Sequence, residues 1–165
     1  MSNRTLILSH RQIDHKIKRI AFQILEFYDG KSDLVIAGIA NNGYIFAQKI
    51  VENLKAISNV EPKLCKIKIN KKKPSEVPQI SMSSEEYKNQ SIFLADDVLN
   101  TGSTLIYAVK HLLETDLKEL KTAVLIDRSH KKFPIKVDFK GISLSTSLHE
   151  TVKVTFGKES KAELL

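Results

Sequence analysis

Two hydrophobic periods alternate along this chain, and the alternation limits the possible folds more than any other feature. Apolar residues at helical spacing over 10–28 precede a continuous apolar run at 34–39, and further continuous runs follow at 92–95 and 123–126. Short runs of this kind, rich in β-branched residues, are typical of strands buried on both faces of a parallel sheet. The sequence therefore predicts an α/β fold, in which one parallel sheet is flanked by helices.

The remaining segments complete this expected architecture. Helical spacing returns over 46–54 and 105–112. In residues 63–69 apolar residues alternate with lysines, which is typical of a strand with one solvent-exposed face. Short strands between 133 and 156 predict a small C-terminal β hood. Residues 70–90 lack periodicity and are expected to form a loop. With no internal repeat and no linker, residues 1–165 are expected to form a single domain.

Composition narrows the class of protein. Of 165 residues, 42% are hydrophobic and 27% charged, which excludes disordered and low-complexity chains. A lone cysteine, Cys65, excludes an internal disulfide and a multi-cysteine metal cage. No apolar run approaches the roughly 20 residues of a membrane span, and the N-terminus lacks an apolar signal core, so a cytoplasmic protein is expected. The net charge of +7 indicates either phosphate-bearing partners or a lysine-rich surface that serves solubility.

Three of the expected strands end in polar turns, at 40–43, 96–104 and 127–130. In open parallel sheets, ligands bind beyond the carboxyl ends of the strands. All three turns are therefore expected at one edge of the sheet, where they would form a single site.

The segment 91–104 reads SIFLADDVLNTGST and carries the most chemistry. The strand delivers two carboxylates, Asp96 and Asp97, and a helix begins near the small residues 101–104. The free N–H groups of a helix start bind anions, whereas paired carboxylates suit ribose hydroxyls or hydrated Mg²⁺. A ligand with a 5′-phosphate and a ribose diol would bind both groups, its phosphate at the helix start and its hydroxyls at the carboxylates. The alternative is an ordinary capped helix beside solvated acids.

This segment resembles the phosphoribosyl-diphosphate (PRPP) motif of type I phosphoribosyltransferases, in which an acidic pair follows an apolar strand and precedes T-G-x-T. The resemblance extends to D-R-S-H and P-I-K-V-D within 127–138, to Ser145–Ser147 and to Glu150. These residues look like the C-terminal half of the bifunctional pyrimidine-operon attenuator/uracil phosphoribosyltransferases. Gly38–Gly43 and the first helix fall in register, so the resemblance covers about residues 5–156.

The resemblance implies an activity: phosphoribosyl transfer from PRPP to a base, here uracil, which gives UMP and pyrophosphate with Mg²⁺ on the diphosphate. It also implies a homodimer or a larger homo-oligomer, and it admits RNA as a partner. No histidine has a partner at metal-ligand spacing, so no metal ligands from the protein are expected. Carried over by position, Asp96 and Asp97 are the catalytic residues. The substrate-binding residues are Asn100, Thr101, Gly102, Ser103 and Thr104 at the 5′-phosphate, Ala40, Asn41, Asn42 and Gly43 at the diphosphate, and Asp127, Arg128 and His130 at the base.

The chain departs from the family pattern at the diphosphate. The branch has a lysine and an arginine before the glycine of this turn, whereas residues 40–43 read A-N-N-G, and Ser103 stands where the branch commonly has arginine. Weakened turnover is therefore expected. The lysines 71–73 either replace the missing cations when the loop closes or form a solvated run. The alternative function is a non-catalytic regulator that binds a nucleotide or PRPP, and RNA in addition.

Overall fold

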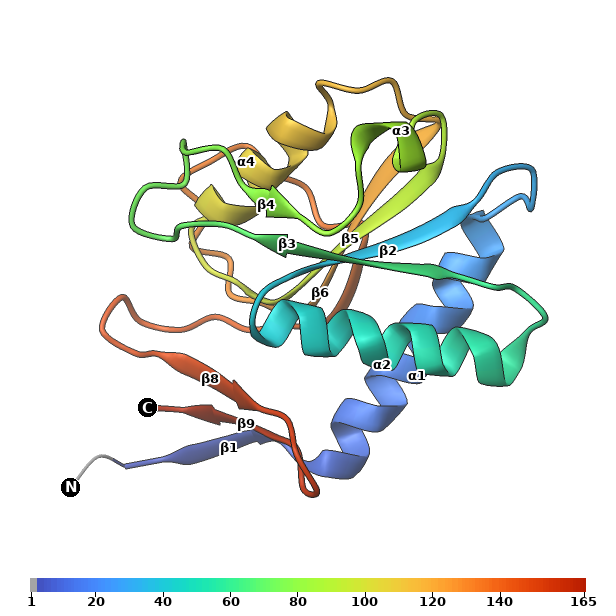
Figure 1. Cartoon of the computed structure of the whole chain (residues 1–165). Helices are drawn as coiled ribbons and strands as arrows, with labels where there is room; N and C mark the ends of the chain where they lie inside the picture. Colours follow the sequence, from blue (N-terminus) through green and yellow to red (C-terminus); the bar gives the residue numbers. More distant parts are fainter. Residues whose placement is uncertain (1–2) are drawn as a thin grey trace.

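The computed structural model describes residues 3–165 and contains two sheets (Figure 1). The larger has six strands in the order β4-β3-β2-β5-β6-β7, all parallel except β4, and the smaller has the order β1-β9-β8. The predicted α/β fold with a parallel sheet is confirmed. The elements are β1 (Thr5–Leu8), α1 (His10–Phe27), β2 (Leu34–Ile39), α2 (Asn42–Ile57), β3 (Lys63–Lys68), β4 (Gln79–Ile80), α3 (Ser84–Tyr87), β5 (Ser91–Leu99), α4 (Ser103–Leu112), β6 (Glu119–Asp127), β7 (Phe139–Ser143), β8 (Val152–Thr155) and β9 (Lys161–Leu164).

Helices cover both faces of the large sheet, and each face has its own core. Side chains of α1 and α2 pack with Ile36 and Phe93 in one cluster, and side chains of α4 pack with Cys65 and Leu94 in the other. Successive residues of β2 alternate between the two clusters, and every residue of this strand is buried. The continuous apolar runs of the sequence are therefore strands enclosed from both sides. In the part of the chain described, no helix is long and apolar enough to cross a membrane.

Strand β5 is longer than its apolar run predicts. It continues through Asp96 and Asp97 to Leu99, because β6 continues beside it and pairs Asp96 with Val124 and Leu99 with Asp127. The expectation that the strand ends where the acidic pair begins is therefore wrong. The acidic pair is held by strand pairing, and the turn to α4 starts four residues later.

The hood is built from both ends of the chain. The expected strand β8 pairs with β9, and β9 pairs in turn with the N-terminal strand β1. Neither β1 nor β9 was expected, since each has only four residues. β1 depends on a partner at the far end of the chain, whereas β9 pairs with β1 and with the nearby β8. The start of α1 joins this assembly, because Nδ1 of His10 accepts a hydrogen bond from the Ser160 N–H (2.9 Å).

Two other expectations are corrected. The segment 70–90 contains β4 and the one-turn helix α3, which a capping box between Ser83 and Glu86 begins. Helix α2 begins at Asn42, inside the expected turn, and so brings its first residues to the edge of the sheet.

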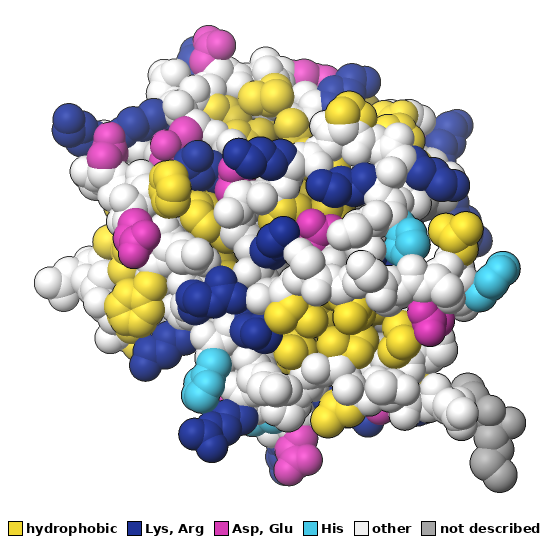
Figure 2. All heavy atoms as spheres, turned by 180° about the vertical axis from the view of Figure 1, so that it is seen from behind, with side chains coloured by type: hydrophobic (Ala, Val, Ile, Leu, Met, Phe, Trp, Pro, Cys, Tyr) yellow, Lys and Arg dark blue, Asp and Glu magenta, His cyan; other side chains and the backbone are white. Residues whose placement is uncertain are grey.

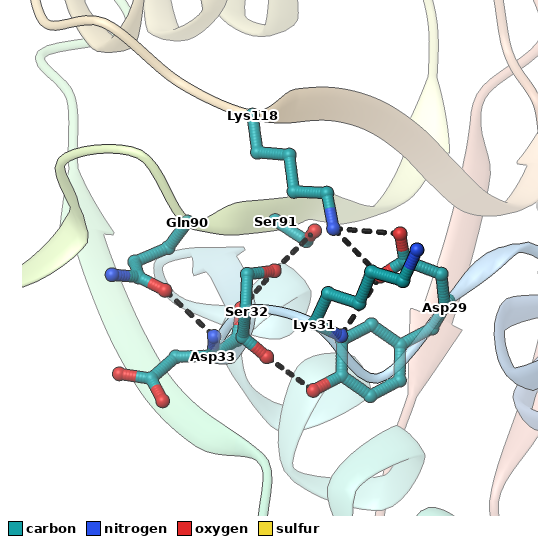
Figure 3. Close-up of polar contacts among 8 residues, drawn as sticks. Asp29, Lys31, Ser32, Asp33, Gln90, Ser91 and Lys118 are labelled. Atoms are coloured by element: carbon teal, nitrogen blue, oxygen red, sulfur yellow. Dashed lines mark hydrogen bonds and ion pairs between the residues drawn. The ribbon is translucent and has the colours of Figure 1, made fainter.

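At the opposite edge, where the strands begin, charged groups neutralise one another (Figure 3). Lys118 Nζ donates to both carboxylate oxygens of Asp29 (2.6 and 2.7 Å), and the hydroxyls of Ser32 and Ser91 lie 2.9 Å apart. The hydrogen bond from Lys118 is the largest cause of a lowered pKa at Asp29. The charged groups at this edge are therefore paired with one another and serve a structural role.

A close approach of α2 to the sheet depends on Gly38. A Cβ at this position would lie 2.6 Å from both the carbonyl oxygen of Gly43 and the Cα of Tyr44, which are backbone atoms that cannot turn away. We expect Gly38→Ala to lower the free energy of unfolding by about 2–3 kcal/mol through overpacking, measured by urea denaturation. Gly157→Ala is the control, because nothing lies within 4 Å of a Cβ there. Equal effects of the two substitutions would contradict the proposed close contact.

Candidate active site

The turn between β5 and α4 forms a small cavity at the carboxyl edge of the sheet. Its volume is about 100 Å³, and its lining includes Asp96, Lys71 and every residue from Asn100 to Leu105. Gly102 caps α4 with a φ of +86°, a left-handed conformation that side chains rarely adopt, and the Ser103 N–H donates to Thr101 Oγ1 (3.2 Å). The amino end of α4 thus faces a cavity, as the anion-cradle interpretation requires.

The acidic pair has one buried and one half-buried member. Asp96 is 7% exposed, and its pKa is raised well above the ordinary value, first by burial and then by the charge of Asp97. Lys71 opposes this shift, and the Asp97 N–H donates to Asp96 Oδ1 (2.9 Å). The raised pKa of Asp96 contrasts with the lowered pKa of Asp29 at the other edge. A buried carboxylate with a raised pKa at a cavity is typical of functional sites.

The turn 40–43 lies against this pair. A Cβ on Gly43 would sit 2.7 Å from Asp96 Oδ1, so only glycine permits the contact. Asn42 Nδ2 donates to Asp97 Oδ2 (3.3 Å) and to the carbonyl of Val154 in β8 (2.8 Å). Asn41 is exposed, and the peptide bond between Ala40 and Asn41 is cis. The structure therefore brings the first and second predicted turns together, and Asn42 links them to the hood.

The turn 127–130 lies at the same edge of the sheet, but its long side chains point into the protein. The Arg128 guanidinium donates to Asn100 Oδ1 (2.9 Å), to Thr146 Oγ1 (2.8 Å) and to the Glu150 carbonyl (2.6 Å). His130 Nε2 lies 2.6 Å from the Thr146 carbonyl oxygen. Arg128 is buried, so its side chain and that of Asn100 fix the wall formed by residues 146–150.

The described structure separates the three lysines of the loop. Lys71 lines the cavity, whereas Lys73 Nζ lies 3.8 Å from Glu76 and Lys72 is exposed. Of the three lysines, Lys71 is therefore the one placed at the cavity, and its replacement of a missing cation stays a prediction. Thr146, which binds both Arg128 and His130, had no signal of its own beyond the family resemblance.

The carboxylates fit a Mg²⁺ ion that arrives with a phosphate ligand. Within residues 3–165, no group of three or more His, Cys, Asp or Glu side chains is arranged to hold a metal. Mg²⁺ usually keeps several waters and takes one or two carboxylates together with substrate phosphates. Asp96 and Asp97, side by side on β5, supply that donor set.

Known proteins are similar to this chain in sequence or in fold. A family model for the phosphoribosyl transferase domain matches residues 3–157. The chain is 33% identical over 162 residues to the "Bifunctional protein PyrR" of Brevibacillus brevis, covering 93% of this chain and 90% of the relative.

Two solved structures are similar in fold. A hypoxanthine-guanine phosphoribosyltransferase of Bacillus anthracis, with HEPES in its active site, has a TM-score of 0.75 at 17% identity over 91% of this chain and 87% of that one. A Trypanosoma cruzi hypoxanthine phosphoribosyltransferase, studied for the role of its C-terminal region in oligomeric state and activity, has a TM-score of 0.75 at 19% identity over 87% and 79%.

Proposed function

The chain belongs to the phosphoribosyl transferase domain family, and on that premise we propose that it transfers phosphoribosyl from PRPP to uracil, with slow turnover. One observation carries the proposal: the buried Asp96 and the amino end of α4 line the same small cavity. A phosphate bound at α4 would place an attached ribose against the carboxylates. The choice of uracil is supported by the resemblance of residues 127–138 to the uracil-specific branch.

The proposed roles follow from the charges. The N–H groups at the start of α4 bind the 5′-phosphate, and Asp96 and Asp97 accept hydrogen bonds from the ribose hydroxyls. These carboxylates also stabilise positive charge that develops on the sugar as the bond from C1 to the diphosphate breaks. Asp96 and Asp97 would hold a Mg²⁺ ion bound together with PRPP, and such an ion would supply positive charge for the leaving diphosphate. The uracil nitrogen then bonds to C1 in place of the diphosphate and releases its proton to water.

The slow turnover is proposed from residues 40–43. None of these side chains is cationic, and the amide of Asn42 already binds Val154 and Asp97. Charge-assisted bonds to phosphate are roughly twice as strong as neutral ones. The same observation supports the second candidate function, a nucleotide-binding regulator without catalysis.

RNA binding stays a prediction for both candidate functions. On the face shown in Figure 2, lysine and arginine side chains are dispersed among apolar ones, whereas nucleic-acid-binding surfaces commonly carry a basic stripe. A homo-oligomer is also proposed. Its support is the family resemblance, together with the Trypanosoma cruzi enzyme of similar fold, which was studied for its oligomeric state.

Titration calorimetry with UMP, uracil and PRPP·Mg²⁺, combined with an assay for UMP formation, tests the proposal. We expect UMP to bind, PRPP to bind more weakly than in relatives that have both cations, and UMP to form slowly. UMP binding with no product under any condition would favour the regulator. No binding of UMP or PRPP by a folded protein would refute both candidates.

A further inference from the structure

The positive charge absent from residues 40–43 is present on the adjacent strand. β3 runs parallel to β2, and the register pairs Ile39 with Ile67. The Ala40 N–H continues this pairing by donating to the Ile67 carbonyl (2.8 Å). The next residue of β3, Lys68, is therefore level with Ala40, one strand away, where strands lie about 4.8 Å apart.

A second lysine of β3 lies against the start of α2. Lys66 Nζ is 5.0 Å from the centroid of the Tyr44 ring, and Tyr44 directly follows Gly43. A cation over an aromatic face is attracted by the ring, so this contact keeps Lys66 beside the first turn of α2. Lys66 and Lys68 thus flank the end of the strand that contacts the turn 40–43.

Neither lysine is neutralised by an acid. Among residues 3–165, no ion pair involves Lys66 or Lys68, whereas Lys63, at the other end of β3, lies 2.6 Å from Asp33. Both lysines also line a hollow of about 300 Å³ beside β4. Their ammonium groups are therefore open to an anionic ligand.

We infer that Lys66 and Lys68 bind the diphosphate of PRPP and provide part of the charge that the turn 40–43 lacks. The inference rests on the proposed function, and it assigns diphosphate binding to residues outside the turn. A lysine side chain spans several ångströms, so an ammonium group from β3 can reach a phosphate above Ala40. Because the diphosphate and the 5′-phosphate occupy opposite ends of PRPP, only ligands that contain the diphosphate depend on these lysines.

The test compares Mg·pyrophosphate with UMP by titration calorimetry. Lys68→Met and Lys66→Met are each expected to weaken pyrophosphate binding about tenfold, the effect of one charge-assisted contact. UMP affinity should change by less than about twofold, because its phosphate lies at α4. Lys63→Met, on the same strand but at its far end, is the control and should leave both affinities unchanged. Lys68→Arg keeps the charge and should retain most of the pyrophosphate affinity.

A rescue experiment separates charge from structure. Ala40→Lys in the Lys68→Met background should restore pyrophosphate binding, since it returns the charge to the neighbouring strand at the same level. Unchanged pyrophosphate affinity in both methionine variants, with UMP still bound, would overturn the inference and leave the proposed function intact. An equal loss of affinity for pyrophosphate and for UMP in the methionine variants, together with a lower melting temperature, would also overturn the inference. Failure of the wild-type protein to bind UMP, PRPP and pyrophosphate would instead refute the proposed function.

Discussion

Asp96→Asn is expected to reduce phosphoribosyl transfer by about a hundred- to a thousandfold and to raise the melting temperature at neutral pH. The loss of activity follows because asparagine has no charge to stabilise the developing positive charge on the sugar. The gain in stability follows because burial and the charge of Asp97 both disfavour ionised Asp96. Asparagine retains the carbonyl oxygen that accepts from the Asp97 N–H, so the local hydrogen bond survives.

The stability of the protein is expected to depend on pH through Asp96. The pKa of folded Asp96 is raised above that of an ordinary aspartate, so the folded state binds more protons than the unfolded state between these two pKa values. Stability of the wild-type protein therefore falls as the pH rises from about 4 through the folded pKa, whereas Asp96→Asn lacks this decline. The difference in melting temperature between variant and wild type should grow with pH and then level off.

Asp29→Asn is the matched control, because the hydrogen bond from Lys118 lowers the pKa of Asp29. Its contribution to stability is present above the unfolded pKa and lost as the pH falls through the folded value. This substitution should lower the melting temperature at neutral pH and leave UMP formation unchanged. Thermal melts between pH 4 and 8 measure both variants. A lower melting temperature for Asp96→Asn at pH 7 would contradict the account of Asp96.

Ala40→Lys combined with Asn42→Arg is expected to raise kcat/KM for PRPP by about two powers of ten or more. Two charge-assisted hydrogen bonds to phosphate, each worth roughly 1.5–3 kcal/mol, correspond to about two to four powers of ten. UMP affinity should change much less, since UMP lacks the diphosphate. The double variant also loses the hydrogen bond from Asn42 to Val154, so its melting temperature should fall slightly.

The control keeps side-chain size without charge: Ala40→Met combined with Asn42→Gln should give no gain. Steady-state kinetics with PRPP and uracil provides the measurement. If the charged double variant folds and gains nothing, the site has lost more than the cations of this turn. If the wild-type protein already turns over as fast as relatives that have both cations, other groups replace them fully, and the proposed slow turnover is wrong.

Much of the fold could be predicted because hydrophobic periodicity is a local property of the chain. The runs at 34–39, 92–95 and 123–126 became the buried centre of β2, β5 and β6, and their shared direction put three polar turns at one edge. The extension of β5 through Asp96 and Asp97 could not be predicted in this way. Charged residues carry no strand signal, and only pairing with β6 keeps them extended.

The sequence by itself determined the parallel sheet, the position of the acidic pair before a helix start, and the absence of cations from residues 40–43. Only the tertiary structure decided which groups surround that pair. Burial raised the pKa of Asp96, the separate lysines 66, 68 and 71 were brought toward one edge, and Arg128 was bound within the protein. The reason is that charge and hydrogen bonding act over a few ångströms in space, often between residues far apart in the sequence, such as Asn42 and Val154, which are 112 positions apart.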